Sequence, residues 1–181
     1  MQYVSFKTVL DAIRNSAQDR IFRLELLQNY NVEDEYEDYQ KFLNGDPVQL
    51  DGFEFWKDII DTNLEKNVPM ERVRLITYPL TLYTKFEIEW GYMFSVPAGE
   101  RIYVVYEDEF NSLDLASRVP ALVDFWLIDE TFGFFLTYDI LHRHYANFTI
   151  PDEWIPQLCD ISRTLLDKSE KIENTSLWKN M

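Results

Sequence analysis

The spacing of apolar residues predicts two helices in the first quarter of the chain. Residues 6–16 follow Ser5, whose hydroxyl can accept from a free backbone N–H group, and their apolar positions recur at helical intervals (Phe6, Val9, Leu10 and Ile13). A second helix, acidic in its first turns, is predicted from about Val32 until Gly45 ends it. Each helix needs another element to cover its apolar stripe.

Two more helices follow from the same reasoning. Asp51 can cap a helix with the apolar stripe Trp56, Ile59, Ile60 and Leu64. The last long helix is predicted from Pro151 to about Ile172. Pro151 suits a helix start, and the helix dipole favours the acidic residues that follow it, Asp152 and Glu153.

Short segments rich in β-branched and aromatic residues predict about five strands. Residues 21–27 alternate as in a strand with one buried face (Phe22, Leu24 and Leu26 against Arg23 and Glu25), although Leu and Glu also favour a helix there. The other strands are expected at residues 72–78, 102–107, 123–129 and 132–138. The short turn at Asp129 and Glu130 predicts a hairpin between the last two.

The segment from Leu80 to Phe94 fits both periodicities. Some of its apolar residues recur as on a helix (Leu82, Tyr83, Phe86 and Trp90), and others alternate as on a strand (Phe86, Ile88 and Trp90). We expect a helix up to Gly91, followed by a turn at residues 97–99.

Together these elements predict a single α/β domain of the α+β type. We expect a mixed, largely antiparallel sheet of about five strands flanked by helices over residues 1–172. Residues 173–181 are expected to form a frayed tail, in which Trp178 is a candidate for docking onto the domain. The length of 181 residues suits one core, and 46% hydrophobic residues exclude disorder for most of the chain.

The net charge bears on the class of partner, the absence of long apolar runs on location, and the surroundings of the single cysteine on its role. The net charge of -15 opposes direct binding to nucleic acid or anionic lipid, so we expect a protein partner, although surplus carboxylates also serve solubility. The chain has no leader and no run of 18 apolar residues, so a cytoplasmic location is expected. Cys159 lies among apolar residues at helical spacing and is interpreted as a buried structural thiol.

Several segments, in order, resemble an uncharacterised bacterial domain-of-unknown-function family. They are FRLE at 22–25, FLNG at 42–45, RVRLITYPLTLYTKFE at 72–87, AGE at 98–100 and DFWLID at 124–129. Members of that family are often encoded beside helix-turn-helix regulators, which makes such a regulator a candidate partner. The likeness covers residues 6–138 and leaves the function open.

The order of a strand, an acidic turn, the DFWLID strand, a hairpin and a closing helix also resembles one half of the catalytically dead phospholipase D-like domains of bacterial regulators. An active site of that kind needs a histidine nucleophile and a lysine two residues later, whereas this chain has His142-Arg143-His144. The pair is also a poor metal site, and we interpret it as surface histidines near a helix start. The chain lacks a Gly-rich phosphate loop, GxSxG and CxxC, so no cofactor or catalytic residue is predicted.

Polar residues inside otherwise apolar segments form a candidate binding site: Arg72, Arg74, Tyr83, Glu87, Glu100 and Asp124. The two arginines share one face of a strand, and Tyr83 and Glu87 share one face of a helix. One interpretation is a pocket in which arginines bind an anionic group. The other is an ion-pair network that fixes a helix against the sheet.

A second candidate is an acidic face where a loop enters a helix: Glu33, Asp34, Glu35, Tyr36, Glu37 and Asp38. The helix dipole accounts for part of this charge, and the excess, interleaved with tyrosines, suits docking onto a basic surface. The sequence therefore predicts a non-enzymatic regulatory or protein-interaction domain. A small-molecule or anion-binding domain, an enzyme included, is the alternative.

Overall fold

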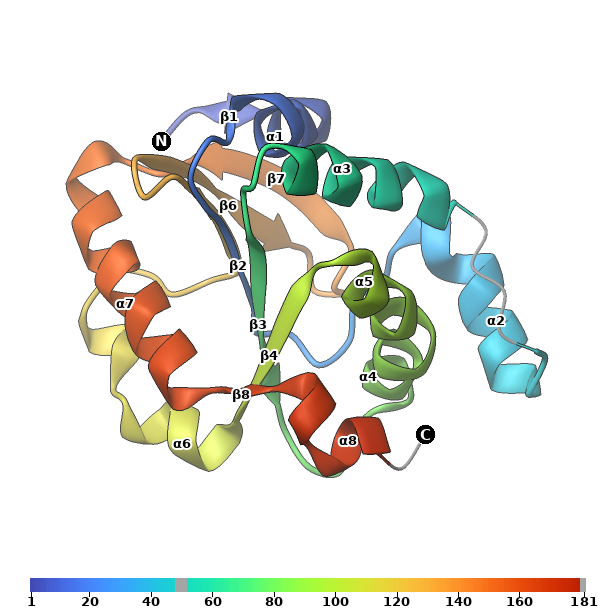
Figure 1. Ribbon diagram of the computed structural model, residues 1–181. Helices are drawn as coiled ribbons and strands as arrows, with labels where there is room; N and C mark the ends of the chain where they lie inside the picture. Colours follow the sequence, from blue (N-terminus) through green and yellow to red (C-terminus); the bar gives the residue numbers. More distant parts are fainter. Residues whose placement is uncertain (48–51, 180–181) are drawn as a thin grey trace.

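A mixed β-sheet forms the middle layer of the molecule (Figure 1). In the computed structural model, which describes residues 1–47 and 52–179, the sheet has eight strands in the order β1-β7-β6-β5-β2-β3-β4-β8. Three neighbours are parallel: β2 (Ile21–Glu25), β3 (Met70–Ile76) and β4 (Arg101–Tyr106). The others pair antiparallel: β1 (Tyr3–Val4), β5 (Phe125–Ile128), β6 (Phe132–Tyr138), β7 (His144–Thr149) and β8 (Glu170–Lys171). The predicted α+β class, with a mixed and largely antiparallel sheet, is confirmed.

The estimate of about five strands is too low. The five predicted strands are all present, and β5 and β6 form the predicted hairpin. The sequence reading missed β1 and β8 because two residues are too few to show alternation. It missed β7 because His144 and Tyr145 are both exposed and the next two residues are both buried, which hides the period of two.

The two helices predicted near the amino terminus are confirmed. The first comprises α1 (Phe6–Asp11) and a π-helical turn, η1 (Ala12–Ser16), and the Ser5 hydroxyl accepts from the Thr8 N–H at 3.1 Å. The second begins as the 3-10 turn η2 (Glu33–Glu35) and continues as α2 (Tyr36–Asn44). Gly45 ends it with a φ of 75°, a left-handed conformation that glycine adopts without steric cost.

The later helices differ from the prediction in their ends. Helix α3 (Phe53–Glu65) begins after Gly52, and its predicted cap, Asp51, lies outside the described residues. The ambiguous segment is helical and runs past Gly91 as α4 (Leu82–Phe86), η3 (Glu87–Tyr92) and α5 (Met93–Ala98). The last long helix is η5 (Asp152–Trp154) with α7 (Ile155–Lys168), so it stops four residues before Ile172.

Helices cover both faces of the sheet (Figure 1). Helix α7, with α6 (Glu107–Ser112) and the turn η4 (Leu115–Ser117), lies on one face over an apolar core that includes Phe22, Leu24 and Phe125. Helices α1, α3, α4 and α5 lie on the other face. The prediction that β2 has one solvent face is therefore wrong: Glu25 is buried and Arg23 is largely buried, because β2 is a central strand with helices on both sides.

Residues 172–179 form short helical turns that pack on the domain, whereas a frayed tail was predicted for residues 173–181. After β8 the chain forms η6 (Ile172–Asn174) and α8 (Ser176–Lys179), and Leu177 and Trp178 pack against a cluster around Ile76, Ile88 and Ile172. Most of the tail is polar, but these two apolar side chains pack against the cluster that includes Ile88 on η3.

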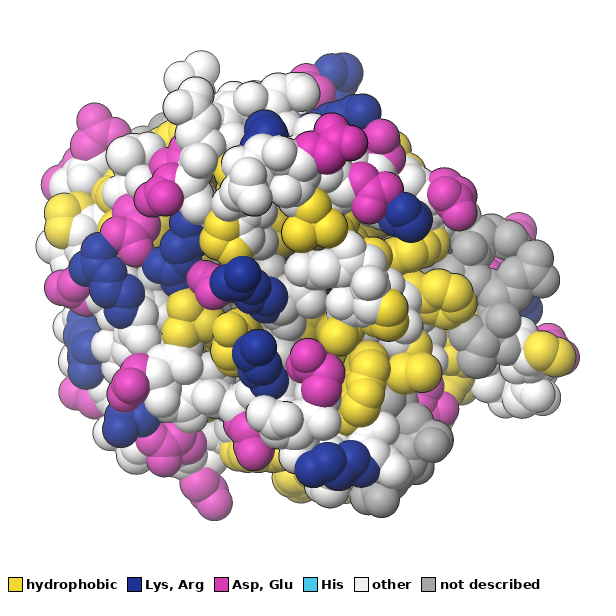
Figure 2. Space-filling model, viewed as in Figure 1, with side chains coloured by type: hydrophobic (Ala, Val, Ile, Leu, Met, Phe, Trp, Pro, Cys, Tyr) yellow, Lys and Arg dark blue, Asp and Glu magenta, His cyan; other side chains and the backbone are white. Residues whose placement is uncertain are grey.

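Acidic and basic side chains are interspersed on the face shown in Figure 2, while hydrophobic side chains gather over α3, α4 and α5. The excess negative charge of the chain therefore forms no single patch on this face. None of the helices within residues 1–47 and 52–179 has the length and apolar character needed to cross a bilayer.

Candidate functional site

Charged side chains from two neighbouring strands meet on the sheet face beneath α3 and α4. The parallel register of β2 and β3 places Arg23 beside Arg72 and Glu25 beside Arg74. Alternation along each strand turns all four side chains to the same face. We call this group the arginine–carboxylate cluster, together with Glu87 and Glu100, which contact its arginines, and Asp124, which is joined to Arg74 through Tyr30.

Arg72 is the centre of one half of the cluster. Its Nε donates to Glu100 Oε1 at 2.9 Å, and its guanidinium lies 3.2 Å from Glu25 Oε1. Trp56 on α3 donates its indole N–H to the second oxygen of Glu100 at 3.0 Å. The guanidinium also lies over the rings of Trp56 and Tyr92, at 5.9 and 5.6 Å from their centroids. Arg72 on β3 thus contacts Glu25 on β2, Trp56 on α3, Tyr92 on η3 and Glu100 in the turn before β4.

Arg74 is the centre of the other half. Its guanidinium donates to Glu87 Oε2 at 2.5 Å and to the Tyr30 hydroxyl at 3.2 Å. Tyr30 in turn donates to Asp124 Oδ2 at 2.5 Å, and the other oxygen of Asp124 accepts from the Leu26 N–H at 2.9 Å. A chain of hydrogen bonds therefore runs from η3 through β3 to the start of β5.

Burial and the neighbouring arginines shift the pKa values of the buried acidic residues in opposite directions. Burial would raise the pKa of Glu25, but Arg23, Arg72 and Arg74 together lower it to about 2. For Glu87, burial raises the pKa to about 8 against the opposing charge of Arg74. Burial also raises the pKa of Asp124, against its hydrogen bonds from Tyr30 and the Leu26 N–H.

The cluster favours the structural interpretation over an anion pocket. Its three arginines face four acidic residues, and Arg72 and Arg74 donate to protein carboxylates. A bound anion would have to displace a buried carboxyl partner of Arg72 or Arg74, and that displaced group would lose its cationic partner. The arrangement instead ties the sheet to the helices above it.

Five of the six predicted binding residues belong to this cluster, and Tyr83 lies beside it. The Tyr83 hydroxyl donates to Glu35 Oε2 at 2.6 Å, and its ring lies 5.9 Å from the ring of Tyr30. Sequence reasoning missed Arg23, Glu25, Tyr30, Trp56 and Tyr92. Arg23 and Glu25 were taken for an exposed strand face, and the one signal that could have included them is their spacing of two, which matches that of Arg72 and Arg74.

Four tyrosines border a cavity of about 240 Å³ next to the cluster. Tyr30 comes from the loop after β2, Tyr36 and Tyr39 from α2, and Tyr83 from α4; the remaining lining residues are Asn31, Val32, Glu35 and Gln40. We call this the tyrosine cavity. Burial raises the pKa of Glu35, while its hydrogen bond from Tyr83 opposes the rise.

The predicted acidic face is divided by the fold. Glu33, Asp34 and Glu37 are exposed, together with Tyr36, whose side chain is 60% accessible. Glu35 turns towards Tyr83, and Asp38 is buried, with one oxygen 3.0 Å from Lys41 Nζ. The exposed part of the face is therefore Glu33, Asp34, Tyr36 and Glu37, of which Tyr36 also lines the tyrosine cavity.

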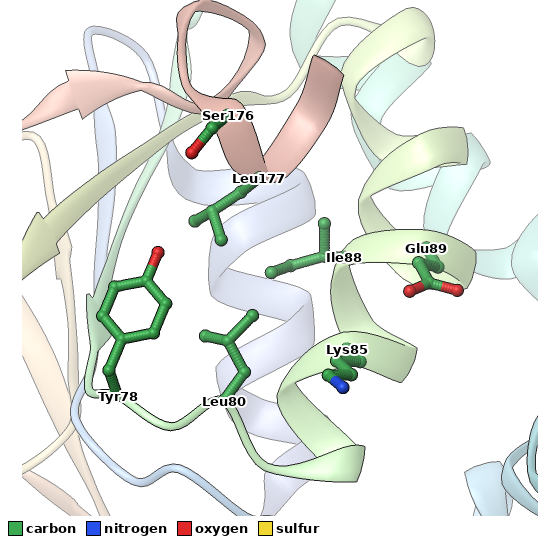
Figure 3. A pocket seen from close by; sticks show the side chains of 7 residues that line it. All are labelled: Tyr78, Leu80, Lys85, Ile88, Glu89, Ser176 and Leu177. Carbon is green, nitrogen blue, oxygen red and sulfur yellow. The ribbon is translucent and has the colours of Figure 1, made fainter. Parts of the chain in front are cut away.

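A second cavity, of about 310 Å³, lies between the loop after β3, helix α4 with η3, and α8 (Figure 3). Tyr78, Leu80, Ile88 and Leu177 point towards one another across it, while Lys85 and Glu89 stand on the helix at its edge. Its inner lining is mainly apolar, and no charged groups converge inside it, so it offers little chemistry.

The histidines and the cysteine lie outside both cavities. His142 is in a turn with a φ of 59°, and His144 begins β7, where its ring hydrogen-bonds to Asn147 at 2.8 Å; the predicted position near a helix start is wrong. Cys159 is buried, as predicted, and burial raises the pKa of its thiol. Within the described residues, no group of three His, Cys, Asp or Glu side chains is placed to hold a metal ion.

The fold and the cluster define an α+β domain that is braced internally by buried ion pairs. Residues 7–175 match a family model described as a domain of unknown function (DUF6879), and the chain belongs to this family. The predicted resemblance to a domain-of-unknown-function family is thereby confirmed. A search of curated proteins gave no match to the sequence.

Proposed function

We propose that this domain is a non-enzymatic interaction module that binds a basic surface of a protein partner through the exposed acidic residues at the start of α2. The observation that carries the proposal is the joint exposure of Glu33, Asp34 and Glu37 around Tyr36. Carboxylates steer a basic partner towards the surface, and an exposed tyrosine supplies contact area at its centre.

The interior of the domain supports this role. The charged groups of the arginine–carboxylate cluster pair with one another inside the domain. The Tyr83 hydroxyl on α4 donates to Glu35 Oε2 at 2.6 Å, which links α4 to η2, the turn that precedes α2. Rings of Tyr39 and Phe86 also meet across α2 and α4, with centroids 5.3 Å apart. The acidic residues are thus presented from a helix that is packed against the domain, which reduces the ordering cost of binding.

The candidate partner is a bacterial helix-turn-helix regulator in the cytoplasm, since regulators of this type carry basic DNA-binding surfaces. The resemblance to families encoded beside such regulators, and to phospholipase D-like domains that have lost catalysis, supports a regulatory role. The net charge of -15 favours contact with a basic surface of the regulator and opposes binding to nucleic acid or anionic membranes.

The test is a charge reversal, Glu33→Lys with Glu37→Lys, in a co-purification of the domain with the neighbouring regulator from the native host. We expect an intact fold, weaker recovery of the regulator, and a smaller decrease of binding with added salt, because steering charges are lost. The matched control is Asp108→Lys with Glu109→Lys in the first turn of α6, where both acids are exposed.

The control makes the same change in net charge at another helix start, on the opposite side of the sheet from α2 (Figure 1). Equal recovery and equal salt dependence for the two double variants would contradict the proposal, because net charge alone would then explain any effect.

A further inference from the structure

We propose that the tyrosine cavity is a binding site for a quaternary ammonium group. The cavity shares Tyr36 with the exposed acidic face but is not lined by Glu33, Asp34 or Glu37, and its ligand is a small organic cation. Four of its eight lining residues are tyrosines, one is glutamate, and none is lysine, arginine or histidine. Aromatic faces attract a cation through the negative potential above the ring, most strongly where water is excluded.

The tyrosine rings that line the cavity are inclined to one another. Tyr39 and Tyr83 have centroids 5.7 Å apart and planes inclined by 66°, and Tyr30 and Tyr83 are 5.9 Å apart and inclined by 60°. Rings inclined in this way present faces and edges in several directions. One face of Tyr39 is stacked on Phe42, with centroids 6.3 Å apart and planes inclined by 14°, so only its other face can meet a ligand. Tyr36 is 60% exposed, so it borders the entrance.

The hydroxyl groups of the two deepest tyrosines are already engaged. Tyr30 donates to Asp124 at 2.5 Å, and Tyr83 donates to Glu35 at 2.6 Å. Donation to a carboxylate increases the electron density of the phenol ring and leaves that hydroxyl proton unavailable to a ligand. Arg74 lies 5.0 Å from the Tyr30 ring, so one side of this ring is occupied and Tyr39 and Tyr83 supply the principal faces.

A quaternary ammonium group matches this lining better than other ions. An anion would meet Glu35 and no cationic side chain. A guanidinium or primary ammonium group would bring five or three N–H donors, whereas the side-chain carbonyl and carboxylate acceptors of the lining are limited to Asn31, Glu35 and Gln40, and one Glu35 oxygen already accepts from Tyr83. A quaternary ammonium has no such donors, and its methyl groups pack on the rings. Its charge favours the ionised form of Glu35 and so opposes the burial that raises the pKa of this residue.

The volume sets the size of the ligand. About 240 Å³ lies below the range of roughly 300 to 1,000 Å³ that is usual for drug-sized ligands, so the cavity suits a compact headgroup. The shared chemistry of such headgroups is a trimethylammonium group, whether it belongs to a free compound such as choline or to a trimethylated lysine side chain.

The experiment is isothermal titration of the purified chain with tetramethylammonium, choline and a peptide that contains trimethyllysine. The neutral control is 3,3-dimethylbutan-1-ol, which has the shape of choline with carbon in place of the charged nitrogen. We expect saturable binding of the cations with one site per chain, and at least tenfold weaker binding of the neutral compound. The stronger of choline and the peptide identifies the source of the group.

Substitutions then locate the site. Tyr39→Leu should weaken tetramethylammonium binding at least fivefold because it removes a ring face, whereas Tyr39→Phe should preserve binding. Tyr36→Leu, at an exposed position that tolerates substitution, should give a smaller loss. Tyr145→Leu, at an exposed position of β7 outside the cavity, should have no effect. No saturable binding of any cation, equal binding of the neutral compound, or unchanged affinity in both Tyr39→Leu and Tyr36→Leu would overturn the proposal. These titrations need no protein partner, so their outcome is separate from the co-purification.

Discussion

The guanidinium of Arg74 lies 2.5 Å from the carboxyl group of Glu87, and the Arg74 side chain is entirely buried. Arg74 is on β3 and Glu87 begins η3, so this pair fastens the helical segment 82–98 to the parallel part of the sheet. Because the same arginine donates to Tyr30, it also holds one wall of the tyrosine cavity. The arginine–carboxylate cluster and the tyrosine cavity are therefore connected through Tyr30.

Arg74→Met should lower the free energy of unfolding by about 3 kcal/mol or more, since removing one partner leaves Glu87 and Tyr30 without their buried donor. Urea denaturation measures this change. The control is Arg101→Met on β4, whose guanidinium is largely exposed and lies 3.7 Å from Glu71. We expect a change below about 0.5 kcal/mol for the control. A comparably small change for Arg74→Met would place Arg74 outside any network.

Glu25 should make the protein more resistant to acid. Its pKa is lowered from 4.5 to about 2, so its contribution to stability is present above pH 4.5 and is lost as the pH falls through about 2. The free energy of unfolding of the wild type, minus that of Glu25→Gln, should therefore rise by about 3 kcal/mol between pH 2 and pH 4.5. Denaturation curves at several pH values measure it. A difference that is constant across this range would contradict a carboxylate held by three arginines.

Asp129 should stabilise the β5–β6 turn through its side chain. Its carboxylate accepts from the N–H groups of Gln18, Asp19 and Arg20 at 2.8 to 3.1 Å, while its own φ is 51°. Asp129→Ala should cost about 2 kcal/mol in the free energy of unfolding. Asp114→Ala is the matched control, because Asp114 has a φ of 46° without a capping hydrogen bond from its side chain. Equal losses would mean that only the left-handed backbone matters.

Gly133 should tolerate no side chain, because a Cβ atom there would lie 2.2 Å from the carbonyl oxygen of Trp126 on the paired strand. Gly133→Ala should lower the free energy of unfolding by about 2 kcal/mol or more, since backbone must move. Gly91→Ala in the helical segment meets nothing within 4 Å and should stabilise by about 0.5 to 1 kcal/mol. Thermal unfolding of both variants is the measurement, and equal melting temperatures would contradict the close strand contact.

Local patterns in the sequence were sufficient for most elements of the fold. Helix α1 was predicted from Ser5 and the spacing of its apolar residues, and the β5–β6 hairpin from the break at Asp129 and Glu130. These signals act over a few residues, so they are readable without knowledge of the rest of the chain. The edge strands β1 and β8 were not predicted because two residues form a strand only when a neighbour offers an unpaired edge.

The candidate binding residues were predicted for a related reason. Arg72, Arg74 and Glu87 stand among apolar neighbours, and a charge in such a segment needs a partner when the segment is buried. Their actual partners depend on the parallel pairing of β2 with β3, which places Glu25 between the arginines. Pairing between strands about 50 residues apart leaves no mark in local periodicity, so Glu25 looked like a solvent-facing residue.

The sequence by itself determined that a block of acids stands at the start of α2 and that tyrosines are interleaved with it. The tertiary structure alone decided which of them face solvent. It turned Glu35 towards Tyr83 and buried Asp38, while Glu33 and Glu37 stayed exposed. The reason is physical: adjacent helical residues point about 100° apart, and only the packing of α2 against α4 fixes which directions lead into the protein.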